Sequence, residues 1–165
     1  GQRWAQGRHE AHGSGRGDDM KSLTIFVPGL PVAQPRPRAV AFRGHARMYS
    51  PGTSNEWKAC VIHALRGNAG LFPAGVPLRC DLTFYLPRPK GHFGSGRNIH
   101  ALKSSAPKRP TGKPDRDNLD KAVCDAITAA GVWRDDSQVT DGRIRKRYCL
   151  DGQSGCEITI TEDVE

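Results

Sequence analysis

The chain has 165 residues, a length that suits a single domain. Lysines and arginines number 25 against 17 acidic residues, and the net charge of +8 favours a polyanionic partner. The sequence contains no long apolar run or apolar signal segment, so it indicates neither a membrane span nor secretion. Five cysteines, an odd number without a C-x-x-C pair, favour reduced thiols in a cytoplasmic protein, and no glycine-rich motif for a nucleotide cofactor is present.

Residues 1–19 are rich in glycine, arginine and histidine and have no apolar periodicity. This composition predicts a disordered N-terminal extension, either an upstream segment or an expression remnant, with Met20 as a candidate natural start. The predicted globular domain therefore covers residues 20–165.

The first half of that domain contains four candidate elements. Residues 23–27 alternate as a strand, and residues 40–49 form a short hairpin around Gly44. Thr53 and Glu56 have the spacing of a capping box, which predicts a core-packing helix that ends near Gly67. His63 on this helix is expected to be structural. Residues 78–86 alternate strictly and predict the clearest strand of the chain.

The C-terminal residues predict two more strands. Residues 139–150 alternate, with arginines on one face, and residues 151–155 have the composition of a turn before a last strand through Ile158 and Ile160. We expect these two strands to form a hairpin. A disulfide between Cys149 and Cys156 is disfavoured because of the expected compartment. The fold class is therefore α+β: a single domain with a mixed sheet of about five to six strands and two main helices.

Basic residues gather in three places in the sequence. A proline-rich stretch carries Arg36 and Arg38, residues 88–114 form a loop with no acidic residue, and the strand predicted over residues 139–150 carries an arginine row. The candidate contacts to DNA phosphates are Arg36, Arg38, Lys108, Arg109, Lys113, Arg143, Arg145 and Arg147. The alternative is that these side chains only keep loops and an exposed sheet face solvated.

Residues 113–139 contain the highest density of candidate functional residues. Asp115 and Asp117 are separated by one residue, so an extended lead-in would project both carboxylates to one side. Asp117 is a candidate N-cap of a helix whose apolar stripe runs from Leu119 to Ala130 and which stops at Gly131. The line of Asp117, Lys121 and Asp125 lies opposite that stripe on a helical wheel.

The acidic pair Asp135 and Asp136 follows this helix after a short turn. Three carboxylates at one helix end would suit Mg²⁺, or Mn²⁺, which take oxygen ligands and keep waters for a substrate phosphate. The spacing does not fit a calcium-binding EF-hand loop, because Asp120 occupies the position that requires glycine. The competing interpretation is a helix cap, an ion pair of Asp117 with Lys121 and a turn.

A longer pattern extends across the same stretch: P-D-x-D-N-L-x-K, then D-A, G-x-W and D-D-x-Q-V. It resembles the RusA family of Holliday junction resolvases. The matching positions are Pro114, Asp115, Asp117, Asn118, Leu119, Lys121, Asp125, Ala126, Gly131, Trp133, Asp135, Asp136, Gln138 and Val139.

The resemblance implies metal-binding aspartates at Asp115, Asp117 and Asp136, with Asp135 as a second choice, and a catalytic lysine at Lys121. It also implies a homodimer that cuts four-way DNA junctions with Mg²⁺ in recombination and repair, in a bacterial cell or encoded by a phage. Two alternatives remain open at this stage: a structure-selective nuclease with another substrate, and a basic DNA-binding protein whose aspartates only cap a helix.

Overall fold

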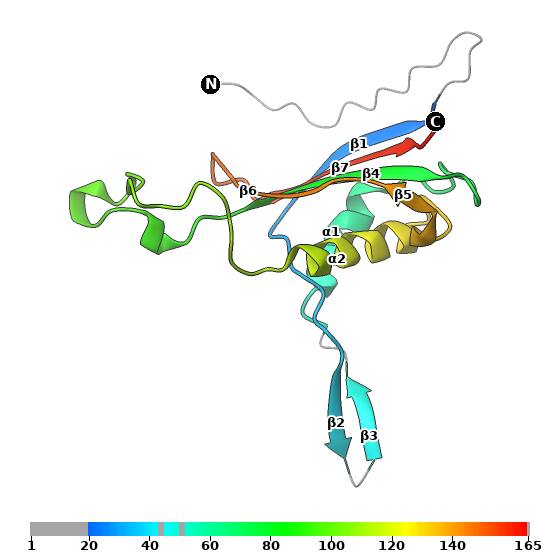
Figure 1. Ribbon diagram of the computed structural model, residues 1–165, viewed down its shortest axis with the longest axis horizontal. Helices are drawn as coiled ribbons and strands as arrows, with labels where there is room; N and C mark the ends of the chain where they lie inside the picture. Colours follow the sequence, from blue (N-terminus) through cyan, green and yellow to red (C-terminus); the bar gives the residue numbers. More distant parts are fainter. Residues whose placement is uncertain (1–19, 43–44, 50–51, 165) are drawn as a thin grey trace.

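A computed structural model describes residues 20–42, 45–49 and 52–164. The prediction for residues 1–19 lies outside these ranges. The described chain forms a five-stranded mixed sheet with the helices α1 (Asn55–Ala64) and α2 (Arg116–Ala129) on one face. Figure 1 shows the other face of the sheet without a covering helix. The α+β prediction is confirmed.

The centre of the sheet is β4 (Leu78–Leu86), which runs antiparallel to β7 (Gly155–Glu162). On its far side β7 pairs antiparallel with β1 (Ser22–Pro28). The other edge of β4 pairs in parallel with two short strands, β5 (Val139–Asp141) and β6 (Ile144–Tyr148). The N- and C-terminal parts of the domain therefore meet in one sheet.

The strict alternation of β4 places Leu78, Cys80, Leu82, Phe84 and Leu86 in the core. Successive side chains of a strand point to opposite faces, so Arg79, Asp81, Thr83 and Tyr85 lie on the open face. The core side chains of α2 pack beneath the buried face, and they are Leu119, Ala122, Val123, Cys124, Ala126 and Ile127. A strand with one buried and one polar face thus fixes the side on which the helices pack.

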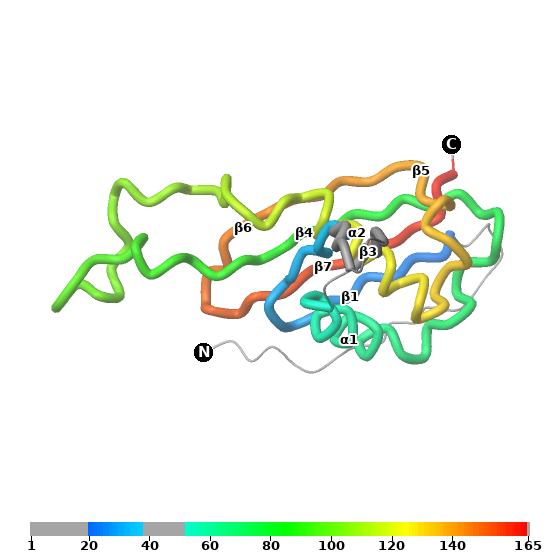
Figure 2. The backbone as a smooth tube through the Cα atoms, turned by 90° about the horizontal axis from the view of Figure 1, so that it is seen from below, coloured from blue at the N-terminus to red at the C-terminus, as the bar shows by residue number. Residues whose placement is uncertain are grey.

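Two segments project from this body. The hairpin of β2 (Arg38–Phe42) and β3 (His45–Tyr49) extends away below the helices, which confirms the predicted hairpin. The connection from β4 to α2 contains two short 3₁₀ turns, η1 (Lys90–His92) and η2 (Gly96–Asn98). Figures 1 and 2 both show this connection reaching past the end of the sheet before it returns to the start of α2.

The predicted C-terminal hairpin is wrong. The single strand expected over residues 139–150 is divided into β5 and β6 at Gly142, where a Cβ atom would collide with the carbonyl oxygen of Cys80. β6 pairs with β4 and not with β7, so β4 separates the two C-terminal strands. Cys149 and Cys156 therefore do not face each other across a hairpin, and both are free thiols.

Both helices begin differently from the prediction. The N-cap of α1 is Ser54, without a side-chain capping bond, so the expected capping box is wrong. The N-cap of α2 is Asp115, two residues before the expected Asp117, which lies inside the first turn. The stop at Gly131 is confirmed by its positive φ of 71°. Within the described ranges, no helix has the length and apolar character needed to cross a membrane.

Candidate metal centre

The N-terminal end of α2 presents a carboxylate that the helix does not use. Asp115 has extended backbone dihedrals, and its carbonyl oxygen accepts the N–H of Leu119 at 3.1 Å. Its side chain is exposed and makes no capping hydrogen bond. An N-cap aspartate ordinarily accepts from the second or third backbone N–H of its helix. The oxygens of Asp115 are therefore available to a ligand.

Asp117 lies in the first turn of α2 and faces the solvent. The backbone N–H of Gln34 donates to the carbonyl oxygen of Asn118 at 2.9 Å, which holds the proline-rich loop beside this turn. As a result the guanidinium of Arg36 approaches the carboxylate of Asp117 to 3.9 Å. Both side chains are more than two-thirds exposed, at 76% and 71%. The structure thus brings one predicted phosphate contact to one predicted metal ligand.

Lys121 belongs to a chain of charges between the two helices. Its ammonium lies 3.4 Å from the carboxylate of Asp125, and the ammonium of Lys58 on α1 lies 3.3 Å from the other oxygen of that carboxylate. Asp125 and Lys58 are less exposed than Lys121, with 30%, 23% and 58% of their side chains accessible. Asp125 is therefore held by Lys58 of α1 and can orient the more exposed Lys121.

The two aspartates after α2 differ in their hydrogen bonding. The Asp135 carboxylate accepts the N–H of Ser137 at 2.9 Å and caps the 3₁₀ turn η3 (Asp136–Gln138). The hydrogen bonds from Ser137 hold the pKa of Asp135 below its usual value. Gln138 fixes the turn by donating to the carbonyl oxygens of Pro73 and Val76, at 2.8 and 3.1 Å. Asp136 is exposed and lies outside this capping arrangement.

Asp120 lies among the candidate ligands. Burial raises the pKa of its carboxyl above the usual value, and repulsion from Asp136 and Asp117 raises it further, against a hydrogen bond from Cys124. That thiol lies 3.3 Å from an Asp120 oxygen. The carboxylates of Asp117 and Asp136, from two separate elements, are therefore both within electrostatic range of one carboxyl group.

The donor chemistry of this helix end fits Mg²⁺. Its accessible carboxylates are hard oxygen ligands, and Mg²⁺ is commonly held by only one or two carboxylates together with water and substrate phosphate. Across residues 20–42, 45–49 and 52–164, no three His, Cys, Asp or Glu side chains are close enough to hold a metal ion between them. Asp115, Asp117 and Asp136 therefore do not form a closed metal-binding cluster within these ranges.

A lysine of the sheet binds the segment that leads into α2. Lys146 on β6 donates to the carbonyl oxygens of Gly112 and Pro114, at 2.7 and 2.9 Å. Pro114 directly precedes Asp115, so β6 determines where the chain enters α2. Lys146 lies on the helix side of the sheet, because its register partner on β4 is the buried Phe84.

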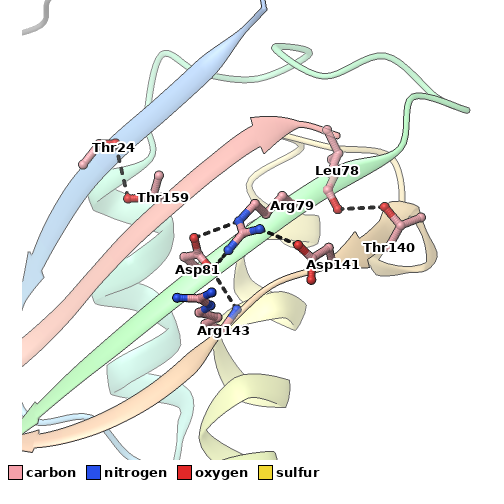
Figure 3. A network of polar contacts seen from close by, with 8 residues as sticks. All are labelled: Thr24, Leu78, Arg79, Asp81, Thr140, Asp141, Arg143 and Thr159. Atoms are coloured by element: carbon pink, nitrogen blue, oxygen red, sulfur yellow. Dashed lines mark hydrogen bonds and ion pairs between the residues drawn. The ribbon is translucent and has the colours of Figure 1, made fainter. Parts of the chain in front are cut away.

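The predicted arginine row lies on the other face of the sheet. Arg145 and Arg147 are the register partners of Thr83 and Tyr85 on the open face. The N–H of Arg143 donates to Asp81 at 2.7 Å, within a network in which Arg79 also pairs with Asp81 and Asp141 (Figure 3). The sheet thus separates these arginines from the carboxylates at α2.

The other predicted DNA contacts differ in their placement. Lys108, Arg109 and Lys113 are exposed on the connection that leads into α2. Arg38 begins β2, and its side chain lies outside what the structure describes. Lys113 is two residues from Asp115 and is thus nearest in sequence to the candidate metal ligands.

Sequence reasoning missed two lysines that support the site. Lys58 lies on α1, whose apolar periodicity predicts core packing alone. Lys146 was hidden between Arg145 and Arg147, although its alternation with Ile144 and Tyr148 placed it on the apolar side of the strand. The ammonium of a lysine on an apolar stripe needs a hydrogen-bond acceptor, so the position of Lys146 in the sequence indicates such a contact.

Comparison with known proteins identifies the family. The family profile described as endodeoxyribonuclease RusA matches residues 28–161. The uncharacterized protein YqaN of Bacillus subtilis (strain 168) is 36% identical over 132 residues, which cover 78% of this chain and 89% of that protein.

Two relatives with a named activity match over a shorter segment. The crossover junction endodeoxyribonuclease RusA of Escherichia coli (strain K12) is 52% identical over 48 residues, or 29% of this chain and 39% of that protein. The same enzyme of Enterobacteria phage 82 matches to the same extent. The profile match spans most of the chain, from the last residue of β1 into β7, and includes every element of the candidate metal centre. The chain therefore belongs to the RusA family of endodeoxyribonucleases.

Proposed function

We propose that the protein is a Mg²⁺-dependent endodeoxyribonuclease that resolves four-way DNA junctions by paired, symmetric phosphodiester hydrolysis, in recombination and repair. The observation that carries the proposal is the uncommitted carboxylate of Asp115 at the start of α2, beside the exposed Asp117. Family membership and the names of the relatives from Escherichia coli and phage 82 support the substrate.

The proposed ligands of Mg²⁺, or of Mn²⁺ in its place, are Asp115, Asp117 and Asp136. A bound Mg²⁺ acidifies a water and stabilises negative charge on the phosphoryl and leaving oxygens. Asp136 is preferred over Asp135 because the Asp135 carboxylate already accepts the N–H of Ser137. The N–H groups at the start of α2 and the helix dipole favour the substrate phosphate at the same place.

Lys121 is the proposed catalytic cation. It lies one helical turn after Asp117, and its side chain is 58% exposed while its ammonium lies 3.4 Å from the carboxylate of Asp125. A flexible ammonium can leave such an exposed ion pair at low cost, because solvent screens it. Lys121 can then donate to the charge that develops on the reacting phosphate.

The basic residues are proposed to hold the DNA backbone around this centre. Arg36 lies beside Asp117, and Lys108, Arg109 and Lys113 lie on the approach to α2. Arg143, Arg145 and Arg147 are on the opposite face of the sheet, so they would contact a DNA arm that passes the β6 edge. Each neutralised phosphate releases counterions, so affinity should fall steeply with salt.

A homodimer would supply the two cuts. A four-way junction presents two symmetry-related strands, and a two-fold dimer presents one acidic centre to each. Sedimentation equilibrium would test this part of the proposal. A stable monomer at the concentration used for cutting would contradict it.

The deciding experiment follows cutting of an end-labelled four-way junction in Mg²⁺. The comparisons are a linear duplex of the same sequence, EDTA in place of Mg²⁺, the Asp117→Asn variant, and Asp151→Asn as a matched change in an exposed turn. We expect symmetric paired nicks that need Mg²⁺ and Asp117 but are indifferent to Asp151.

Two results would contradict the proposal. Equal cutting of duplex and junction would indicate a nuclease of broader substrate range. Junction binding without cutting under any divalent metal would leave a DNA-binding protein and reduce the aspartates to helix-capping residues.

A further inference from the structure

The connection from β4 to α2, residues 88–114, is built as an arm. Its two limbs are joined by a bridge between Phe93 and Leu102. The N–H of Gly94 donates to the carbonyl of Ala101, and that of Lys103 to the carbonyl of His92, both at 2.9 Å. Residues 95–100 thus form a closed tip and not an open chain.

The base of the arm is fixed to β6. The guanidinium of Arg88 stacks over the ring of Tyr148 at 4.2 Å and donates to the carbonyl of Pro107 at 2.9 Å. The ring of His92 meets Tyr148 edge-on at 5.4 Å. Because Tyr148 is in the sheet, these contacts give the arm a defined direction from the body (Figures 1 and 2).

The arm carries positive charge without a compensating acid. Residues 88–114 contain seven lysines and arginines and no aspartate or glutamate. Six of the seven are exposed: Lys90, Arg97, Lys103, Lys108, Arg109 and Lys113. The arm joins α2 at Asp115, so a strand held along these cations leads to the candidate metal centre. Such a surface suits a DNA backbone.

Two large apolar side chains stand exposed on the same arm. Ile99 is 58% exposed at the tip, and Leu102 is 49% exposed at the bridge that closes it. Neither belongs to the hydrophobic core of the domain. A polyanionic backbone gives no reason for isoleucine and leucine at the end of a cationic arm. Unstacked base faces would account for these two side chains, because apolar side chains of DNA-binding proteins can insert between base steps.

We propose that Ile99 and Leu102 form an apolar wedge that enters the branch point of the DNA, while the exposed cations of the arm hold the flanking strands. The inference rests on the proposed function, because only branched DNA places weakly stacked base pairs beside converging backbones. The wedge opens the crossing so that the scissile phosphate reaches the carboxylates at α2. Strand opening and cutting are thereby assigned to different residues.

The test separates opening from cutting. A four-way junction carries 2-aminopurine, which fluoresces when unstacked, either at the branch point or in the middle of one arm, with EDTA present to prevent cutting. The wild-type protein is compared with the double variant Ile99→Ser/Leu102→Ser. The matched control is Leu150→Ser, which alters an apolar side chain that is 95% exposed on another turn.

We expect the wild-type protein and Leu150→Ser to raise the fluorescence at the branch point but not in the arm. The double variant should lose this rise and keep junction affinity within about threefold, because the cations remain. In Mg²⁺ it should cut an intact junction at least about tenfold more slowly, since the unstacking energy is no longer supplied. A junction with unpaired bases already at its centre should restore its rate.

Two outcomes distinguish the wedge from the function on which it rests. If the double variant gives a wild-type fluorescence rise and wild-type cutting of the intact junction, the wedge is wrong and the resolvase proposal stands. If the wild-type protein neither binds nor cuts junctions, both are wrong. Loss of cutting that the pre-opened junction does not restore would also overturn the wedge.

Discussion

The ammonium of Lys146 on β6 lies 2.9 Å from the carbonyl oxygen of Pro114, the residue before Asp115. A second bond of 2.7 Å to Gly112 makes the contact bidentate. A strand at the edge of the sheet is thereby tied to the start of the helix that carries the candidate metal ligands. The position of Asp115 depends on this contact as well as on the helix itself.

Replacing Lys146 by methionine should impair cutting without removing any proposed ligand. The apolar stem stays, but the two carbonyl oxygens lose their donor, and displacement of reacting groups by about 1 Å can cost a hundredfold in rate. We expect kcat for junction cutting to fall about tenfold to a hundredfold, with KM nearly unchanged. The free energy of unfolding should fall by about 2 kcal/mol, the scale of a charge-assisted hydrogen bond.

The control for this change is Arg66→Met, which removes one exposed positive charge after α1. Both variants are measured by steady-state cutting over a range of junction concentrations and by urea unfolding. Equal kcat in Lys146→Met and in the wild-type protein would show that the bond is structural only. Partial recovery of kcat in Lys146→Arg is expected, because the guanidinium keeps donors but alters their geometry.

The two adjacent aspartates after α2 should respond differently to the same substitution. Asp135 caps η3 through Ser137, whereas Asp136 is free of that bond and lies within electrostatic range of Asp120. Asp136→Asn should lower Mg²⁺-dependent cutting by at least about a hundredfold, the scale expected when a group acting in the transition state is lost. Asp135→Asn should keep cutting within about threefold, since an asparagine oxygen can still cap.

The assay for this pair is cutting rate as a function of Mg²⁺ concentration, together with circular dichroism to confirm folding. The opposite ranking, with Asp135→Asn the inactive variant, would assign the ligand to Asp135. Asp151→Asn again supplies the exposed control.

The local sequence pattern predicts the helices and strands better than it predicts which strands pair in the sheet. The alternation of β4 gave its span and its buried face, and the apolar stripe of α2 gave the helix and its stop at Gly131. The C-terminal strands were paired wrongly because a nearby turn makes a hairpin the default. The actual partner of β6 is β4, more than fifty residues earlier, and no local signal encodes that contact.

For the candidate site, too, the sequence predicts local features better than contacts between distant segments. The motif spacing predicts the acidic helix end and Lys121 as site residues, because those residues are close in sequence. It left Asp135 and Asp136 open, since the choice depends on the cap of η3 and on Gln138, which reaches back to Pro73. Lys58 and Lys146 reach the region only through packing of α1 and β6, so sequence spacing did not predict them.

The position of Lys121 should depend on Asp125. Asp125→Asn removes the negative charge that both Lys121 and Lys58 approach. We expect kcat to fall about tenfold with little change in KM, less than the loss of about a thousandfold expected for Lys121→Met, which removes the proposed cation itself. Lys58→Met should fall between the wild-type protein and Asp125→Asn, because Lys121 keeps its partner.

Steady-state initial rates over a range of junction concentrations separate kcat from KM for these variants. Asp151→Asn serves as the control for a lost exposed carboxylate. An unchanged kcat in Asp125→Asn would show that the Lys121–Asp125 pair stabilises α2 but does not orient the lysine.

The open face of the sheet offers a test of stability against pH. Burial of Asp81 opposes its ionisation, but hydrogen bonds from Arg79 and from the N–H of Arg143 outweigh that cost and lower its pKa below 3.8. A depressed folded-state pKa stabilises the protein above the unfolded value, and the stabilisation is lost as pH falls through the folded value. The contribution of Asp81 should therefore be complete at pH 7 and should shrink below about pH 4.

Asp81→Asn measures this contribution, because asparagine keeps the shape and loses the charge. At pH 7 its Tm should lie about 3 °C below that of the wild-type protein, the shift that a change of about 1 kcal/mol gives a domain of this size. Asp151→Asn should match the wild-type Tm at both pH values. A gap between Asp81→Asn and wild type that stays constant from pH 7 to pH 3 would show that the carboxylate charge contributes nothing, and that Arg79 and Arg143 need only an oxygen acceptor at this position.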